Sequence, residues 1–120
     1  MKKRPKIVEN AIQSFIDKVN ELLGDRVKKI VLYGSYARGD FNESSDIDIM
    51  ILTNLTDDEI IKYRGEIAGL AYDVEEENNF DIYLSPLLKN LDKFNYWLEA
   101  LPFYMNVEKE GVVLSESKNI

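Results

Sequence analysis

The chain has 120 residues and a net charge of −7, with 22 acidic and 15 basic side chains. This length fits one domain with a single core, and the acidity argues against binding long nucleic acids, whose affinity depends mainly on lysine and arginine. Because the sequence has neither cysteine nor histidine, disulfides, thiol nucleophiles, imidazole catalysis and Cys/His zinc sites are excluded, which leaves carboxylates, hydroxyls, lysine, arginine and oxygen-bound metals.

The N-terminal segment MKKRPK is basic, but the charged residues Glu9 and Asp17 interrupt the apolar residues that follow it. A signal peptide or a transmembrane helix needs a longer apolar run. We therefore expect no membrane association, and we expect a cytoplasmic location, which the absence of cysteine permits.

The first half of the chain predicts one helix and two strands. Apolar residues at helical spacing over residues 6–23 predict an amphipathic helix that Gly24 ends. The β-rich run 30–33, closed by Gly34, predicts a buried strand. Residues 46–52, DIDIMIL, alternate, with isoleucine at every second position. This alternation predicts a strand with its isoleucines on the core and its aspartates and methionine on the opposite face.

The next part of the chain predicts two helices with a strand between them. A capping-box sequence at residues 56–59 predicts the start of a helix that continues to Val74. Residues 80–84, FDIYL, predict a third strand. The Ser-Pro pair that follows predicts a helix over residues 85–101, with the proline in its first turn.

The end of the chain completes a mixed pattern of helices and strands. Residues 102–111 predict a short helix, and residues 112–114 predict an edge strand. We therefore predict an α+β fold, a mixed α/β arrangement in which helices flank a sheet of three to four strands. A single domain would cover residues 1–120, with the helix of residues 1–24 packed on it.

The polar stretch GSYARGDFNESSDID, residues 34–48, does not match two common phosphate and metal motifs. Gly34 and Gly39 have the spacing of the outer glycines of a P-loop, but Asp40 stands where the lysine is required. An EF-hand register that starts at Asp40 also fails, because serine and isoleucine occupy its glycine and glutamate positions. A solvated turn leading into an ordinary strand is the remaining structural alternative.

Asp46 and Asp48 project from one face of the predicted strand, so their like charges repel unless a cation joins them. Aspartate is also a poor strand former. Two aspartates on one face therefore indicate a metal site. Asp81, on the next predicted strand, offers a third carboxylate if the two strands are neighbours.

The Gly34-Ser35 pair closes a strand and opens a predicted helical turn, where backbone N–H groups and a hydroxyl suit phosphate oxygens. Carboxylates that hold Mg²⁺ beside such a site are what nucleotidyl transfer needs, because two cations can bridge a triphosphate and activate the attacking hydroxyl. Positioning and charge neutralisation do this work, so histidine and cysteine are not needed.

The spacing of these residues resembles that of a known family. Gly34-Ser35, ten residues and then Asp46-Ile47-Asp48 resemble the G-S-x10-D-x-D motif of the DNA polymerase β-like nucleotidyltransferase superfamily. The string GSYARGDFNESSDIDIMIL, the small size and the closing NVEKEGVVL are similar to its minimal nucleotidyltransferase (MNT-type) branch. The resemblance extends from the first predicted strand to the end of the chain.

The resemblance implies a nucleotidyltransferase with ATP as its substrate and two Mg²⁺ ions as cofactors. Gly34 and Ser35 would bind the nucleotide phosphates, and Asp46 and Asp48 would bind the metals. Asp81 would be the third metal ligand and would help to activate the attacking hydroxyl.

Two further residues of the polar stretch have two interpretations each. Arg38 either contacts phosphate or forms an ion pair with Asp40 or Glu43 of the same loop. Tyr36 either stacks on a base or packs in the core, and we favour packing.

MNT-type proteins are similar to antitoxins encoded beside HEPN-domain toxins. This resemblance implies a type VII-like antitoxin that transfers AMP from ATP to a tyrosine of a HEPN toxin, in a hetero-oligomer with it. The acidity of the chain suits a basic partner, and so short a chain is expected to receive its acceptor from another protein. Two alternatives are an antitoxin that neutralises its toxin by binding alone and a small-molecule (antibiotic) nucleotidyltransferase.

Overall fold

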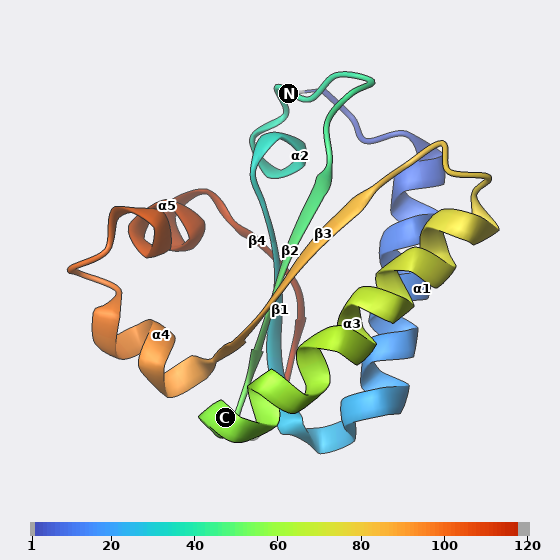
Figure 1. The fold of residues 1–120 in the computed structure, drawn as a ribbon. Coiled ribbons are helices and arrows are strands. Elements are labelled where there is room, and N and C mark those ends of the chain that lie inside the picture. The colour runs from blue at the N-terminus through green and yellow to red at the C-terminus, as the bar shows by residue number, and fades with distance from the viewer. Residues whose placement is uncertain (1, 118–120) are drawn as a thin grey trace.

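The computed structural model describes residues 2–117 and has a four-stranded mixed sheet with helices on both faces (Figure 1). The strands, in the spatial order β3-β2-β1-β4, are β1 Val27–Tyr33, β2 Ile47–Thr53, β3 Leu84–Asn90 and β4 Val112–Glu116. The helices are α1 Lys6–Leu23, the 3-10 turn η1 Gly24–Arg26, α2 Ser35–Arg38, α3 Asp57–Glu77, α4 Leu91–Trp97 and α5 Pro102–Glu110. The predicted fold class, a mixed sheet flanked by helices, is confirmed.

The two central strands determine where the polar loop begins and ends. β1 pairs antiparallel with β2, and this ladder places Tyr33, the last residue of β1, opposite Asp48. β4 pairs antiparallel with β1, whereas β3 runs parallel to β2 and places Ser85 beside Asp48. Because Gly34 follows Tyr33 directly, the register alone brings the Gly-Ser pair to the start of β2.

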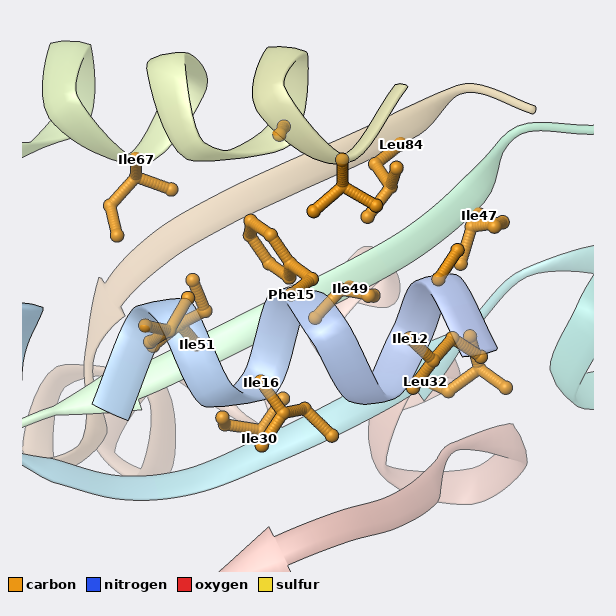
Figure 2. Close-up of a cluster of buried hydrophobic side chains, with 14 of the residues drawn as sticks. Ile12, Phe15, Ile16, Ile30, Leu32, Ile47, Ile49, Ile51, Ile67 and Leu84 are labelled. Atoms are coloured by element: carbon orange, nitrogen blue, oxygen red, sulfur yellow. The ribbon is translucent and has the colours of Figure 1, made fainter. Parts of the chain in front are cut away.

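The larger core lies between the sheet and the helices α1 and α3 (Figure 2). α1 buries one face, on which Phe15 and Val19 have no exposed area. Ile47, Ile49 and Ile51 of β2 enter the same core and are fully buried. The prediction that the alternating isoleucines of this strand face the core is therefore confirmed.

The other face of the sheet is also buried, which the alternation of β2 did not predict. Met50 and Leu52 of β2 pack with Phe94 of α4 and Val107 of α5 in a second cluster. Figure 1 shows α4 and α5 on the face of the sheet opposite α1 and α3. Asp48, which shares this face, therefore lies at the margin of an apolar layer and not on an open solvated face.

The predicted strand over residues 80–84 is wrong except at its last residue. The segment before Leu84 forms a turn and a bend, and β3 continues from there through Pro86. β3 is an edge strand that pairs only with β2 among the described strands. A proline is tolerated at such an edge, because its missing N–H need not be replaced in a ladder.

The helix predicted over residues 85–101 is shorter in the structure, where α4 spans Leu91–Trp97. α4 starts at Leu91, after the Asn90 side chain accepts a hydrogen bond of 2.9 Å from the N–H of Lys93. Asparagine is a favoured N-cap residue. The start of this helix is therefore marked by Asn90 and not, as predicted, by the Ser-Pro pair. The predicted N1 proline thus belongs to a strand.

Other predicted elements are confirmed. α1 spans the predicted residues 6–23, and β4 contains the predicted edge strand over 112–114. Thr56 and Glu59 exchange the two hydrogen bonds of a capping box at the start of α3. In the described part of the chain, no helix combines the length and apolar character needed to cross a membrane.

Ile49 provides the most direct test of the larger core, because its side chain has no exposed area. Replacing Ile49 with alanine should lower the free energy of unfolding by about 2–5 kcal/mol, since buried contacts are lost and a cavity remains. The matched control Ile61→Ala removes the same atoms from a side chain that is 59% exposed, and should change stability by less than about 0.5 kcal/mol. Urea unfolding followed by circular dichroism measures both; equal losses would contradict this placement of Ile49.

Candidate active site

A pocket of about 480 Å³ opens where β1 ends, β2 begins and α2 and α5 approach each other. Small-ligand sites commonly have volumes of about 300–1,000 Å³. The pocket is lined by β1, β2, the β1–α2 junction, α2 and one face of α5. The lining residues are Tyr33, Gly34, Ser35, Arg38, Asp48, Phe103, Asn106, Val107 and Glu110. Gly34, Ser35, Arg38 and Asp48, four of the predicted site residues, thus lie in one pocket.

Gly34 brings the backbone against the carboxylate of Asp48. Its φ of 76° lies in the region that favours glycine, and a Cβ added to it would overlap Oδ2 of Asp48. The chain then turns into α2, where the N–H groups of Ala37 and Arg38 donate to the Gly34 carbonyl at 3.1 and 3.0 Å. Glycine at position 34 therefore permits a short distance between the backbone and the Asp48 carboxylate, and any larger residue would increase this distance.

The Asp48 carboxylate is partly buried, and burial raises its pKa above the usual range. The negative charge of Asp46 raises this pKa further, whereas the positive charge of Arg38 lowers it. The charged form of Asp48 is thus disfavoured by its surroundings. A divalent cation beside it would have the opposite effect and would favour the charged form.

Arg38 connects α2 with α5 across the pocket. Its Nε lies 3.2 Å from Oδ2 of Asp40, and its Nη1 lies 3.3 Å from Oε2 of Glu110. The predicted ion pair within the loop is confirmed for Asp40, whereas Glu110 was not predicted as a partner. Exposed ion pairs contribute little to stability, so Arg38 can exchange these partners for an anionic ligand at low energetic cost.

Two tyrosines lie beside the carboxylates. Tyr36 is 7% exposed and stacks on Phe41 with ring centroids 4.5 Å apart, so its predicted packing role is confirmed. Tyr33 is half-buried, and burial together with the charge of Asp48 raises its pKa to about 12. The Tyr33 hydroxyl therefore stays protonated at neutral pH and can donate a hydrogen bond.

Asp46 and Asp81 lie outside the pocket lining. Asp46 is exposed directly before β2, and its charge raises the pKa of both Asp48 and Tyr36. Asp81 is exposed in the bend before β3, next to the buried Ile82. Within the described part of the chain, no three carboxylates form a group that could hold a metal ion. The part of Asp81 in a metal site therefore stays a prediction.

The Asp46–Asp48 pair nevertheless fits a divalent cation. Mg²⁺ prefers oxygen ligands, and proteins commonly hold it with one or two carboxylates while substrate phosphates and water supply the rest. Burial, followed by the charge of Asp46, raises the pKa of Asp48, and the positive charge of Arg38 offsets this only in part. Asp46 and Asp48 could therefore hold a metal that shares its remaining ligands with a bound triphosphate.

α5 supplies pocket residues that the sequence analysis did not identify. Phe103, Asn106 and Glu110 share with the buried Val107 the i, i+3, i+4, i+7 spacing of one helix face. The sequence predicted this helix but contained no signal that this face meets the start of β2. The second core, in which Val107 packs against the sheet, determines that meeting.

Residues 12–113 match the family model of the nucleotidyltransferase domain. Two proteins of Methanocaldococcus jannaschii are similar in sequence. "Putative protein adenylyltransferase MJ0604" is 35% identical over 106 residues, which cover 88% of this chain and 96% of that protein. "Putative protein adenylyltransferase MJ0141" is 33% identical over 79 residues, which cover 64% of this chain and 74% of that protein.

Solved structures have a similar fold at lower sequence identity. One, described as a "putative nucleotidyltransferase" from Sulfolobus solfataricus, aligns with a TM-score of 0.62 at 15% identity, over 98% of this chain and 94% of that one. Another, a "toxin-antitoxin with AMP-PNP", aligns with a TM-score of 0.51 at 20% identity, over 88% of this chain and 73% of that one. At these identities the structures support the fold alone.

Replacing Asp48 with asparagine should stabilise the metal-free protein at pH 7. The pKa of Asp48 is raised in the folded state, so folding favours the protonated form and stability decreases as the pH rises through this pKa. A neutral side chain of the same size removes this cost. We expect a gain below about 1 kcal/mol in thermal unfolding with EDTA, because Asp48 is only partly buried and solvent screens its interactions.

The pH dependence of this gain is its internal control. The difference between Asp48→Asn and wild type should shrink as the pH is lowered toward 4, because the wild-type carboxyl then becomes protonated as well. An Asp48→Asn variant that is less stable than wild type at pH 7 would contradict the electrostatic description of this residue.

Proposed function

The chain belongs to the nucleotidyltransferase-domain family, and we propose that it is a Mg²⁺-dependent enzyme that transfers AMP from ATP to a hydroxyl of a protein partner. The predicted enzyme class, nucleotidyltransferase, agrees with this family. The observation that carries the finer proposal is the meeting of Gly34, Ser35 and Asp48 in one pocket. This pocket combines a backbone turn and hydroxyl suited to phosphate with a carboxylate suited to a cation.

Gly34, Ser35 and Arg38 form the proposed phosphate end of the site. Ser35 contributes a hydroxyl at the first residue of α2, and Arg38 is the one cation among the described residues that line the pocket. An entering triphosphate would draw Arg38 away from Asp40 and Glu110, because phosphate oxygens accept two charge-assisted hydrogen bonds from one guanidinium.

Asp46 and Asp48 form the proposed metal end, with Asp81 as the candidate for a third ligand. Bound Mg²⁺ would supply a lowered pKa for the attacking hydroxyl and charge neutralisation for the departing pyrophosphate. The absence of a Cβ at Gly34 leaves the space that the Asp48 carboxylate occupies beside the backbone turn before any ligand arrives. Such preorganisation matters, because a site held in its productive geometry loses less free energy when the substrate binds.

The proposed reaction is an in-line displacement at the α-phosphorus of ATP. The acceptor oxygen forms a bond to this phosphorus, the bond from it to the oxygen that bridges to the β-phosphate breaks, and pyrophosphate leaves. The hydroxyl proton passes to a carboxylate, the role that we propose for Asp81. No covalent enzyme intermediate is required, which agrees with a chain that has no cysteine and no histidine.

Two observations favour a protein as the acceptor over a small molecule. The relative that this chain matches over 96% of its length is named "Putative protein adenylyltransferase". Exposed apolar side chains also occur on α4, on α5 and on the segment between these helices. α5 itself borders the pocket. Contiguous exposed apolar surface commonly marks a protein interaction site. These side chains are Tyr96, Trp97, Leu101 and Met105.

The acceptor that we propose is a tyrosine of a HEPN-domain toxin that forms a hetero-oligomer with this chain. A structure of similar fold is described as a toxin-antitoxin with AMP-PNP, and by analogy with it we propose a toxin partner and an adenine nucleotide for this chain. The net charge of −7 suits a more basic partner. Transfer of AMP to the toxin would then silence it, and the chain would act as an antitoxin.

Labelling of the partner tests this proposal. The protein, incubated with Mg²⁺, ATP labelled at its α-phosphate and the protein encoded beside it, should label that neighbour. The double variant Asp46→Asn/Asp48→Asn should lower the rate by at least about 10²–10³-fold, because charge stabilisation at the reacting phosphate is lost. The matched control Asp25→Asn/Asp58→Asn changes two exposed carboxylates outside the pocket and should label at the wild-type rate.

The outcomes separate the competing functions. Absence of label with wild-type protein, or equal label with the Asp46→Asn/Asp48→Asn variant, would contradict the proposed enzyme. If that variant does not label the toxin but still protects cells from it, neutralisation depends on binding alone. ATP labelled at its γ-phosphate should leave the partner unlabelled, because the γ-phosphate leaves with pyrophosphate.

Asp81 has a separate test, because the structure does not group it with the other carboxylates. If Asp81 binds a metal in the working enzyme, Asp81→Asn should lower the rate of transfer by about 10²–10³-fold and raise the Mg²⁺ concentration needed for half-maximal activity. Asp73→Asn, an exposed carboxylate on α3, is the control. A wild-type rate for Asp81→Asn would limit the metal site to Asp46 and Asp48.

A further inference from the structure

We infer that α5 supplies a nucleobase subsite, in which Phe103 stacks on the base and Asn106 hydrogen-bonds to its edge, so that the enzyme selects an adenine nucleotide. This inference deepens the proposed function and rests on it. Both residues line the same pocket as Ser35 and Asp48 but come from a different element.

The pocket has two chemically different walls. Ser35, Arg38 and Asp48 form a polar wall suited to phosphates and a cation. α5 forms the other wall, and its position is fixed because Val107, on the same helix face, is only 2% exposed and packs in the second core. A nucleotide whose phosphates bind at the polar wall therefore brings the rest of the molecule against α5.

Phe103 presents an aromatic ring that is 46% exposed at this pocket. Its ring lies perpendicular to that of Tyr33, with centroids 5.6 Å apart and an interplanar angle of 82°. This edge-to-face contact is a favourable arrangement that orients the ring, and the exposed area shows that part of the ring stays available. Exposed aromatic rings are the usual partners of bases, since every base has a π-face that can stack.

Asn106 lies one helical turn beyond Phe103 and is exposed at the pocket. Its side-chain amide makes no hydrogen bond to the residues that the structure describes. An amide offers both donors and an acceptor, which matches adenine, where the N6 amino group lies beside the N7 acceptor. The corresponding edge of guanine presents two acceptors, O6 and N7, so the amide oxygen would face another acceptor.

The order of residues along α5 matches the order of groups in a nucleotide. Glu110, at the end of α5, contacts Arg38 at 3.3 Å, which places the proposed phosphate ligand Arg38 at that end of the helix. Phe103 precedes Glu110 by seven residues, or about 10 Å along a helix. The base and the phosphates would therefore occupy opposite ends of one pocket.

Binding measurements without any acceptor test this inference. Calorimetric titration of the wild-type protein, in the presence of Mg²⁺, should show that ATP binds at least about tenfold more tightly than inorganic tripolyphosphate. Phe103→Leu should weaken ATP binding by about five- to 150-fold, the range for loss of one stacked base, and should leave tripolyphosphate binding unchanged. Asn106→Leu, which is similar in size and removes the amide without adding a charge, should weaken ATP binding by a similar factor and leave tripolyphosphate binding unchanged.

The matched control is Tyr72→Leu, which removes an aromatic ring that is 54% exposed on α3 and outside the pocket. It should leave the affinities for ATP and tripolyphosphate unchanged. Wild-type affinity for ATP in Phe103→Leu, or equal losses for ATP and tripolyphosphate, would overturn the subsite and leave the proposed function intact. A wild-type protein that binds neither ligand would overturn the proposed function, and the subsite with it.

Discussion

The contact between the Gly34 backbone and the Asp48 carboxylate is the feature on which the candidate site depends. It requires the antiparallel register that places Tyr33 opposite Asp48 and a residue without a Cβ at position 34. Together these bring the start of α2, with Ser35, to the first carboxylate of β2. The long polar loop from α2 to β2 therefore begins and ends at the same end of the sheet.

Burial on both faces of β2 gives this contact its electrostatic character. If the face that carries Asp48 were open to water, as the alternation alone suggested, its carboxylate would be solvated. Instead α4 and α5 cover Met50 and Leu52 beyond it, and burial raises the pKa of Asp48. The same packing provides the second wall of the pocket, because it presents Phe103 and Asn106 to the site. Apolar packing thus both prepares the carboxylate for a cation and shapes the space for a ligand.

Local patterns in the sequence predicted the elements whose signals are contiguous, such as β2 with its isoleucines and α3 with its capping box at Thr56. β3 was misplaced because its pairing with β2 is long-range, and Pro86 at an edge strand resembles a helix start when seen locally. The motif from Gly34 to Asp48 predicted one wall of the pocket through its fixed spacing. The wall formed by Phe103 and Asn106 could not be predicted, because it depends on how α5 packs through Val107.

A crystal structure with Mg²⁺ and a non-hydrolysable ATP analogue would test most directly whether this pocket is a nucleotidyl-transfer site. We expect the triphosphate beside Ser35, the cation between the phosphates and Asp48, and the adenine against Phe103. A nucleotide bound elsewhere would contradict the assignment, for example in the pocket that Lys28 and Lys29 line at the far end of the sheet.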